Sequence, residues 1–314
     1  MDTLQQSRPL LGIALKIVST LAFTAMATLI KLLSDRYPIG ELTFFRSGLA
    51  LIPVLIWAGW RGQLPGAFYT TRFRQHATRS VSGTVAMFCG FTALSMLPIA
   101  DATAIGYATP LVTVIFAVLL LGETVRLYRW SAVVVGLIGV IIILTDYLDP
   151  AAAGPERSLV GAAFAVAGAT AGAFAQVQVR ALTRYEGAAT IVIYFSVTAA
   201  LLSLATLPFG WAMPDAADAA LLVLAGTFGG IGQVLLTQSF RFGEASIIAP
   251  FDYTSMIWAL IVSVAIFGTW PSAVVLAGTA VVVAAGLFVI YREHRLGIER
   301  TRSKRAQTPT TPLS

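Results

Sequence analysis

Long apolar runs separated by short polar breaks extend from about residue 10 to about residue 291. Each run is close to the ~20 residues that an α-helix needs to cross the hydrocarbon core of a bilayer. The pattern therefore predicts ten transmembrane helices, near residues 10–31, 41–60, 80–98, 101–121, 129–146, 158–180, 188–210, 217–239, 245–267 and 271–291.

The first run is predicted to be a transmembrane helix and not a cleaved signal peptide. It is longer than the apolar region of a typical signal peptide, it contains Lys16, and another span follows at once. Composition agrees: 57% of the 314 residues are hydrophobic, only 11% are charged, and the mean hydropathy is +0.81. Soluble domains carry roughly a quarter charged residues, so we predict an all-α polytopic membrane protein.

The positions of Lys and Arg predict the orientation. With the N-terminus in the cytoplasm, sixteen basic residues fall inside and three outside, an asymmetry typical of cytoplasmic loops. The inside set is Arg8, Arg61, Arg72, Arg74, Arg79, Arg126, Arg129, Arg180, Arg184, Arg241, Arg292, Arg295, Arg300, Arg302, Lys304 and Arg305. We expect a multi-pass protein of the bacterial inner (plasma) membrane with both termini cytoplasmic. The tail at 293–314 is basic, then Thr/Pro-rich, and is predicted to be disordered.

Several classes of protein are excluded. The net charge of +6 does not indicate a nucleic-acid partner, because the basic residues lie in short loops and in the tail. The single cysteine, Cys89, and the two histidines, His76 and His294, cannot build a disulfide framework or a metal site. The sequence contains no P-loop, H-E-x-x-H or G-x-S-x-G motif. We therefore expect no enzyme activity, no catalytic residues, no metal and no cofactor.

The chain repeats itself. The stretch 97–144 resembles the stretch 242–290: each has an acid before an alanine, then a tyrosine, then a long helix that ends in glycine. Tyr107 to Gly122 and Tyr253 to Gly268 both span fifteen residues. Because five spans is an odd number, the second copy must insert upside down. We predict repeats at 1–146 and 157–292, an architecture typical of alternating-access transporters.

Asp252 is the most informative polar position, because an ionised carboxylate inside a span costs several kcal/mol. At 1.5 Å per residue it lies ~10 Å below the cytoplasmic edge. In one interpretation, local hydroxyl groups or a helix kink at Pro250 satisfy the carboxylate. In the other, it faces a cavity and serves a cationic or proton-coupled substrate. Lys16 is expected to reach back to the cytoplasmic surface.

Other candidates for substrate binding come from both halves. Arg46 contacts either Glu41, a helix-end carbonyl or an anionic substrate group. Gln233 and Gln176 need hydrogen-bond partners, which a neighbouring helix or a substrate can supply. Tyr107, Tyr253 and Trp258, with Phe251, form either core packing or an aromatic wall for a flat substrate.

Pro110 and Pro250 interrupt the fourth and ninth spans, one in each half. Each proline frees a backbone carbonyl. Paired interruptions in corresponding helices indicate a transport site near the bilayer midplane.

These motifs resemble a known superfamily. The text "LPIADATAI", "YATP" and "LLLGE", with "GGIGQVLLTQSFRFGEASIIAPFDYTSMIWA" in the second half, resembles the drug/metabolite transporter (DMT) superfamily and its ten-helix EamA family. "APFDYTSMIWA" further resembles a branch with S-adenosylmethionine and riboflavin uptake transporters. The resemblance implies that helices one to four and six to nine enclose a cavity. This chain departs from the family at Thr269, where a glutamate is usual, so that role is left to Glu123.

We therefore predict a secondary active transporter that moves a small organic metabolite across the cytoplasmic membrane by alternating access. The alternative is a lipid or lipid-linked metabolite flippase of the same superfamily. The expected partners are a cationic or aromatic small-molecule substrate and membrane lipid. A homodimer, the identity of the substrate, the direction of transport and the coupling ion stay open.

Overall fold

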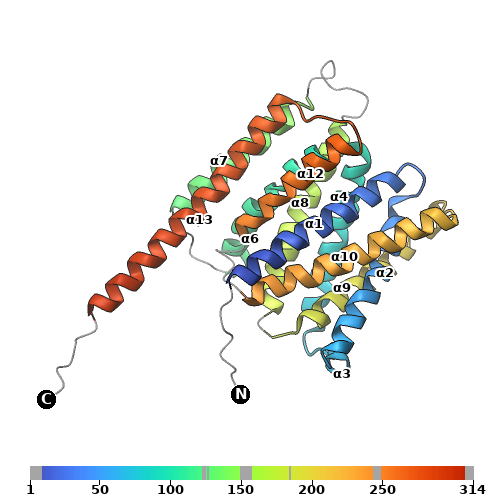
Figure 1. Ribbon diagram of the computed structural model, residues 1–314, viewed down its shortest axis with the longest axis horizontal. Coiled ribbons are helices and arrows are strands. Elements are labelled where there is room, and N and C mark those ends of the chain that lie inside the picture. Colours follow the sequence, from blue (N-terminus) through green and yellow to red (C-terminus); the bar gives the residue numbers. More distant parts are fainter. Residues whose placement is uncertain are drawn as a thin grey trace.

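The computed structural model describes residues 9–121, 125, 127–148, 158–183, 185–242 and 249–307. Within these residues, all regular secondary structure is helical (Figure 1). The helices are α1 (Pro9–Leu33), α2 (Ile39–Trp60), α3 (Leu64–Ala67), α4 (Phe73–Met96), α5 (Ile99–Gly106), α6 (Ala108–Leu121), α7 (Leu127–Thr145), α8 (Leu159–Leu182), α9 (Ala188–Leu204), η1 (Leu207–Phe209), α10 (Ala216–Phe242), η2 (Ala249–Tyr253), α12 (Thr254–Ala265) and α13 (Ala273–Gln307).

The helices confirm the prediction of an all-α polytopic membrane protein. Six described helical segments are long and apolar enough to cross a membrane, and three shorter apolar helices accompany them. The ten predicted runs fall, in order, on α1, α2, α4, α5 with α6, α7, α8, α9, α10, η2 with α12, and α13. The fourth and ninth runs are therefore the two that the structure divides.

The packing of the helices is reciprocal between the two halves. Helix α1 packs along α10, and its counterpart α8 packs along α4. Helix α2 packs against α10, and its counterpart α9 packs against α4. The first two helices of each half thus pack against the third helix of the other half. Two copies related by a two-fold axis produce this exchange, so the halves interlock as one bundle.

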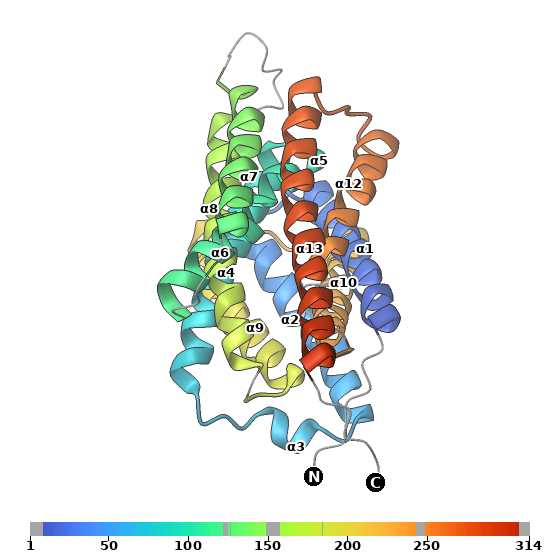
Figure 2. The same cartoon turned by 90° about the vertical axis from the view of Figure 1, so that its left-hand side faces the viewer.

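Helices α7 and α13, the last of each half, pack mainly against each other along one side of the bundle (Figure 1). A buried apolar cluster joins them to α5 and α8 and includes Ile105, Tyr107, Ile143 and Val282. Two smaller clusters fill the space among α1, α2, α4 and α10, and among α2, α9 and α10. Helix α1 begins, and α13 ends, at the same end of the molecule (Figure 2).

Two predicted boundaries differ from the structure. Helix α13 continues to Gln307, so 293–307 is helical where a disordered tail was expected. An existing helix adds one hydrogen bond for each residue it orders, and Arg, Lys, Glu and Ala favour that extension. Helix α4 begins at Phe73, seven residues before the predicted span, so Arg79 lies inside a helix and not in a cytoplasmic loop. Glu123 lies outside the described residues.

Candidate functional site

The fourth and ninth spans are both divided in the described structure. Helix α5 ends at Gly106, and α6 begins at Ala108. Pro110 explains this break, because it has no N–H to donate to the carbonyl of Gly106 four residues earlier. In the second half, Pro250 lies in the 3₁₀ turn η2, which precedes α12. The fourth span is therefore broken close to Pro110, and the described part of the ninth span starts as a 3₁₀ turn that contains Pro250.

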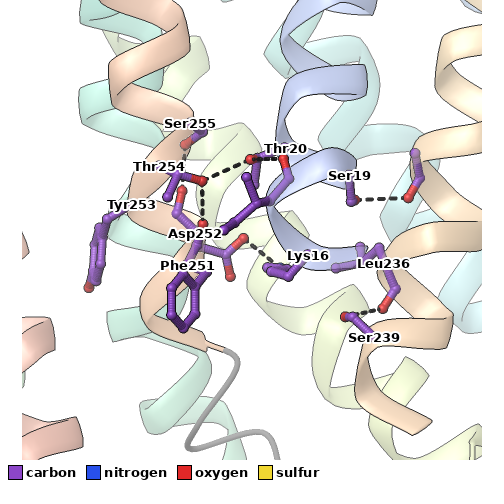
Figure 3. A network of polar contacts seen from close by, with 12 residues as sticks. Lys16, Ser19, Thr20, Leu236, Ser239, Phe251, Asp252, Tyr253, Thr254 and Ser255 are labelled. Atoms are coloured by element: carbon purple, nitrogen blue, oxygen red, sulfur yellow. Dashed lines mark hydrogen bonds and ion pairs between the residues drawn. The ribbon is translucent and has the colours of Figure 1, made fainter. Parts of the chain in front are cut away.

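Asp252 lies in η2 and forms an ion pair with Lys16 of α1 (Figure 3). Lys16 Nζ is 2.6 Å from Asp252 Oδ1. The side chain of Lys16 is 3% exposed, whereas that of Asp252 is 42% exposed. The sequence suggested that Lys16 extends to the cytoplasmic surface. The structure shows instead that its side chain is buried against Asp252. A buried cation needs a nearby anion in the membrane, and Asp252 supplies it.

Hydroxyl groups near the ion pair join α1 to α12 and to α10. Thr20 on α1 shares a hydrogen bond of 2.9 Å with Thr254 on α12. The hydroxyl of Thr254 is also 2.6 Å from the carbonyl oxygen of Phe251. Ser19 donates to the carbonyl of Gly232 on α10 at 2.9 Å. Figure 3 shows Thr20 and Thr254 close to Asp252, whereas Ser19 lies across α1, on the side that faces α10.

Tyr107 and Tyr253 come together from the two interrupted spans. Their rings are 5.1 Å apart and meet edge to face at 70°. Tyr107 is buried and shares a hydrogen bond of 2.9 Å with Ser255. Tyr253 points away from the ion pair (Figure 3), and its hydroxyl lies against Gly286 of α13, where a Cβ atom would collide with it. This pair therefore packs between the halves, and its contact with substrate stays a prediction.

Arg46 lies in the interior of the bundle, on α2. Its Nε donates to Met26 Sδ at 3.3 Å, and its guanidinium carbon is 5.9 Å from the ring centre of Phe195. Glu41, the suggested partner, accepts a hydrogen bond from the backbone N–H of Ala212 at 3.0 Å instead. In the described part of the chain, Arg46 forms no ion pair within 4.0 Å. The suggested pair of Arg46 with Glu41 is therefore wrong.

The remaining candidates lie at separate positions. Gln233 is half-buried on α10, next to Gly232. Trp258 is half-buried on α12, and its indole N–H has no hydrogen-bond partner in the described structure. Gln176 is exposed on α8. The structure therefore brings Asp252 together with Lys16, and Tyr107 with Tyr253, but it does not gather all seven candidates into one cluster.

Two functional candidates were missed in the sequence. The partner role of Lys16 carries no local signal, because 236 residues separate it from Asp252. Arg79 did carry a signal. His76, Arg79, Ser80 and Thr84 stand at positions i, i+3, i+4 and i+8, which is the spacing of one helix face. All four are buried on α4.

A groove of about 400 Å³ lies between α1, α2 and α10. Apolar side chains dominate its lining, including Leu15, Pro53 and Trp57, and it also contacts Arg61 and Gln238. Neither member of the ion pair lines it. It is therefore a surface feature separate from the polar groups around Asp252.

Comparison with known proteins identifies relatives over most of the chain. The model of the EamA-like transporter family matches residues 10–145 and 159–292. An S-adenosylmethionine uptake transporter of Rickettsia bellii is 27% identical over 292 residues, which covers 91% of this chain and 95% of the relative. A pseudopaline exporter of Pseudomonas aeruginosa is 26% identical over 276 residues and covers 87% and 94%. One crystal structure shares the fold with a TM-score of 0.67, at 21% identity, and covers 91% and 98%.

Proposed function

The chain belongs to the EamA-like transporter family, and from that premise we propose that it is a secondary active transporter. It moves a small organic metabolite across the cytoplasmic membrane by alternating access. The relatives named as an uptake transporter and as an exporter support a small-molecule substrate but differ in direction and cargo. The proposal therefore leaves the direction of transport open.

The observation that carries this proposal is the Lys16–Asp252 ion pair. It joins α1 of the first half to the interrupted ninth span of the second half. Asp252 is partly open, so a cationic group of a solute can reach it, while the buried Lys16 keeps it in place. In the proposed cycle, movement between the halves separates and re-forms the pair, and the substrate replaces one of its partners. Such exchange gives a ligand different contacts in two states, which alternating access requires.

The other proposed substrate contacts lie at different places in the bundle. Gln233 on α10 is half-buried, and the indole N–H of Trp258 on α12 is buried without a hydrogen-bond partner in the described structure, so we propose both as substrate contacts. Arg46 is buried beside Met26, which lies ten residues from Lys16 along α1. Tyr107, Tyr253 and Gln176 are retained as candidate contacts of the substrate in the state that this structure does not show.

A lipid or lipid-linked metabolite flippase is the second candidate, and the apolar groove between α1, α2 and α10 favours it. An acyl chain fits such a lining, and Arg61 at the groove could hold a headgroup phosphate. The two candidates differ in a measurable way, because a carrier moves a soluble solute and a flippase moves a lipid.

Counterflow in proteoliposomes tests the proposed function. Vesicles that contain the purified full chain and are preloaded with unlabelled S-adenosylmethionine, or with a panel of small organic cations and zwitterions, take up the matching labelled solute. We expect uptake of at least one solute to exceed that of protein-free vesicles by about tenfold or more, because exchange is faster than leakage. Scrambling of a fluorescent phospholipid without any solute counterflow would instead favour the flippase.

We also propose that both termini are cytoplasmic, since α1 begins and α13 ends at the same end of the bundle. Single cysteines at Tyr69 and Met213, both exposed, test this in a Cys89→Ala background. In intact cells, an impermeant thiol reagent should label Met213→Cys and leave Tyr69→Cys unlabelled until the cells are opened. The reverse pattern would overturn the orientation.

A further inference from the structure

Two buried arginines lie against one aromatic ring in the interior of the bundle. Arg46 comes from α2, Arg79 from α4 and Phe195 from α9. The guanidinium carbons lie 5.9 Å and 3.9 Å from the centre of the Phe195 ring. The arginines are only 2% and 6% exposed. Two like charges are therefore held close to the same ring, away from water.

The donors of these arginines are not all satisfied. Nη1 of Arg46, and both Nε and Nη1 of Arg79, are buried without a hydrogen-bond partner in the described structure. Glu41 on α2 and Glu186, which precedes α9, are engaged elsewhere. Glu41 accepts from the backbone of Ala212, and Glu186 accepts from Thr70 and lies 3.8 Å from His76. No described carboxylate lies within 4.0 Å of either guanidinium group.

Other polar groups nearby share this condition. The hydroxyls of Ser47, Ser80 and Ser196, on the same three helices, are buried without a hydrogen-bond partner among the described residues. Each hydroxyl can donate to an anion. Polar groups left unpaired in a membrane interior are costly and mark ligand pathways. The Phe195 ring offsets part of the positive charge but supplies no hydrogen-bond acceptor of ordinary strength.

The space around the guanidinium groups is small. A Cβ atom on Gly83 would lie 3.2 Å from Arg79 Nη1, and one on Gly229 would lie 2.8 Å from Arg46 Nε. These glycines leave room for the arginine side chains themselves. Any ligand group that pairs with them must be compact, and a planar carboxylate matches the fork of a guanidinium group in two parallel hydrogen bonds.

Resting on the proposed function, we propose that Arg46 and Arg79 form the anion subsite of the transporter and bind the carboxylate of an organic solute. The subsite is separate from the Lys16–Asp252 pair. Met26, which contacts Arg46, is ten residues from Lys16 on α1, a distance of ~15 Å along a helix. A solute that touches both positions at once must therefore be extended, with its cationic group towards Asp252.

Thermal unfolding of the purified full chain in detergent tests the subsite without requiring transport. Two carboxylates are added, benzoate and S-adenosylmethionine, each beside an analogue that lacks the carboxylate: benzamide and decarboxylated S-adenosylmethionine. We expect at least one carboxylate to raise Tm by about 2 °C or more, and its analogue to have a smaller effect. Arg46→Gln and Arg79→Gln should each abolish that difference, and Arg79→Lys should retain part of it, because it keeps the charge and loses the fork.

The variants also separate a ligand site from a structural one. Without ligand, Arg79→Gln should keep its Tm or raise it, because an unpaired buried charge is removed. A fall of several degrees would show that the arginine holds the fold together, and it would overturn the proposal. Equal Tm shifts in wild type and variants, or none with either carboxylate, would also overturn it. A shift with inorganic phosphate or phosphatidylglycerol nanodiscs alone would reject the carboxylate in favour of a phosphate or a lipid headgroup.

Failure of the subsite is distinguishable from failure of the proposed function. If wild type binds a carboxylate and Arg79→Gln does not, but wild type shows no counterflow of any solute, the anion site is supported and the transport function is rejected. If Arg46→Gln and Arg79→Gln show the same counterflow as wild type, the transport function is supported and the anion site is rejected.

Discussion

Asp252→Asn is expected to destabilise the protein by about 3 kcal/mol, because it removes the negative charge with which the buried ammonium group of Lys16 is paired. This is near the low end for a broken buried pair, since the side chain of Asp252 is 42% exposed and water screens part of the loss. The measurement is thermal or denaturant unfolding of the purified variant. Asp35→Asn is the matched control, because Asp35 is an exposed acid in the turn between α1 and α2; its stability should change by less than ~0.5 kcal/mol.

The double variant Lys16→Gln/Asp252→Asn separates stability from function. It removes both charges, so we expect its stability to return to within about 1 kcal/mol of wild type. If the pair takes part in transport, counterflow per folded molecule should remain at least ~10-fold lower, a loss of ~1.4 kcal/mol in the barrier. A double variant that regains both stability and normal transport would show that the pair is only structural.

Gly278→Leu is expected to lower the free energy of unfolding by about 3 kcal/mol and to separate α7 from α13. The two helices meet at a reciprocal contact, where a Cβ atom on Gly278 would lie 2.6 Å from the carbonyl oxygen of Gly139, and one on Gly139 would lie 2.8 Å from that of Gly278. Because both obstacles are backbone atoms, no side-chain rotation relieves the clash, and the helices must move apart. Helix association in membranes depends on such close packing of small residues.

Unfolding in detergent measures this effect, with Gly48→Leu on α2 as the control. A Cβ atom on Gly48 would have no neighbour within 4 Å, so a helix-favouring residue there should be neutral or stabilise by up to ~1 kcal/mol. Equal stability of Gly278→Leu and Gly48→Leu would contradict the α7–α13 contact. Gly278→Ala should fall between the two, because it adds a single methyl group at the point of closest approach.

Much of the helix layout was readable from local features. The apolar runs predicted the spans because a transmembrane helix satisfies its hydrogen bonds within its own segment. The breaks at Tyr107 and in η2 follow from Pro110 and Pro250, which act on residues within four positions. The tail prediction was wrong up to Gln307, because a basic composition was taken as disorder although its residues extend a helix well.

The polar site was only partly predictable. Asp252 was identified by its cost in a span, and Arg46 by its charge. The suggested pair of Arg46 with Glu41 fails on helix geometry, since five residues turn a helix by about 140° beyond one full turn and place the side chains on different faces. Arg79 was assigned to a loop because the first residues of α4 are mostly polar. The structure shows that several of these polar residues form one buried face of the helix.

The sequence by itself determined that this chain is a membrane protein of apolar helices in two related halves, because those properties depend on residues close together in the chain. The tertiary structure alone decided which charges meet. Lys16 and Asp252 are 236 residues apart, and Arg46, Arg79 and Phe195 lie on three different helices. Such partners depend on which face each helix turns towards its neighbours. That choice follows from the sum of many close contacts across the bundle, and no single segment encodes it.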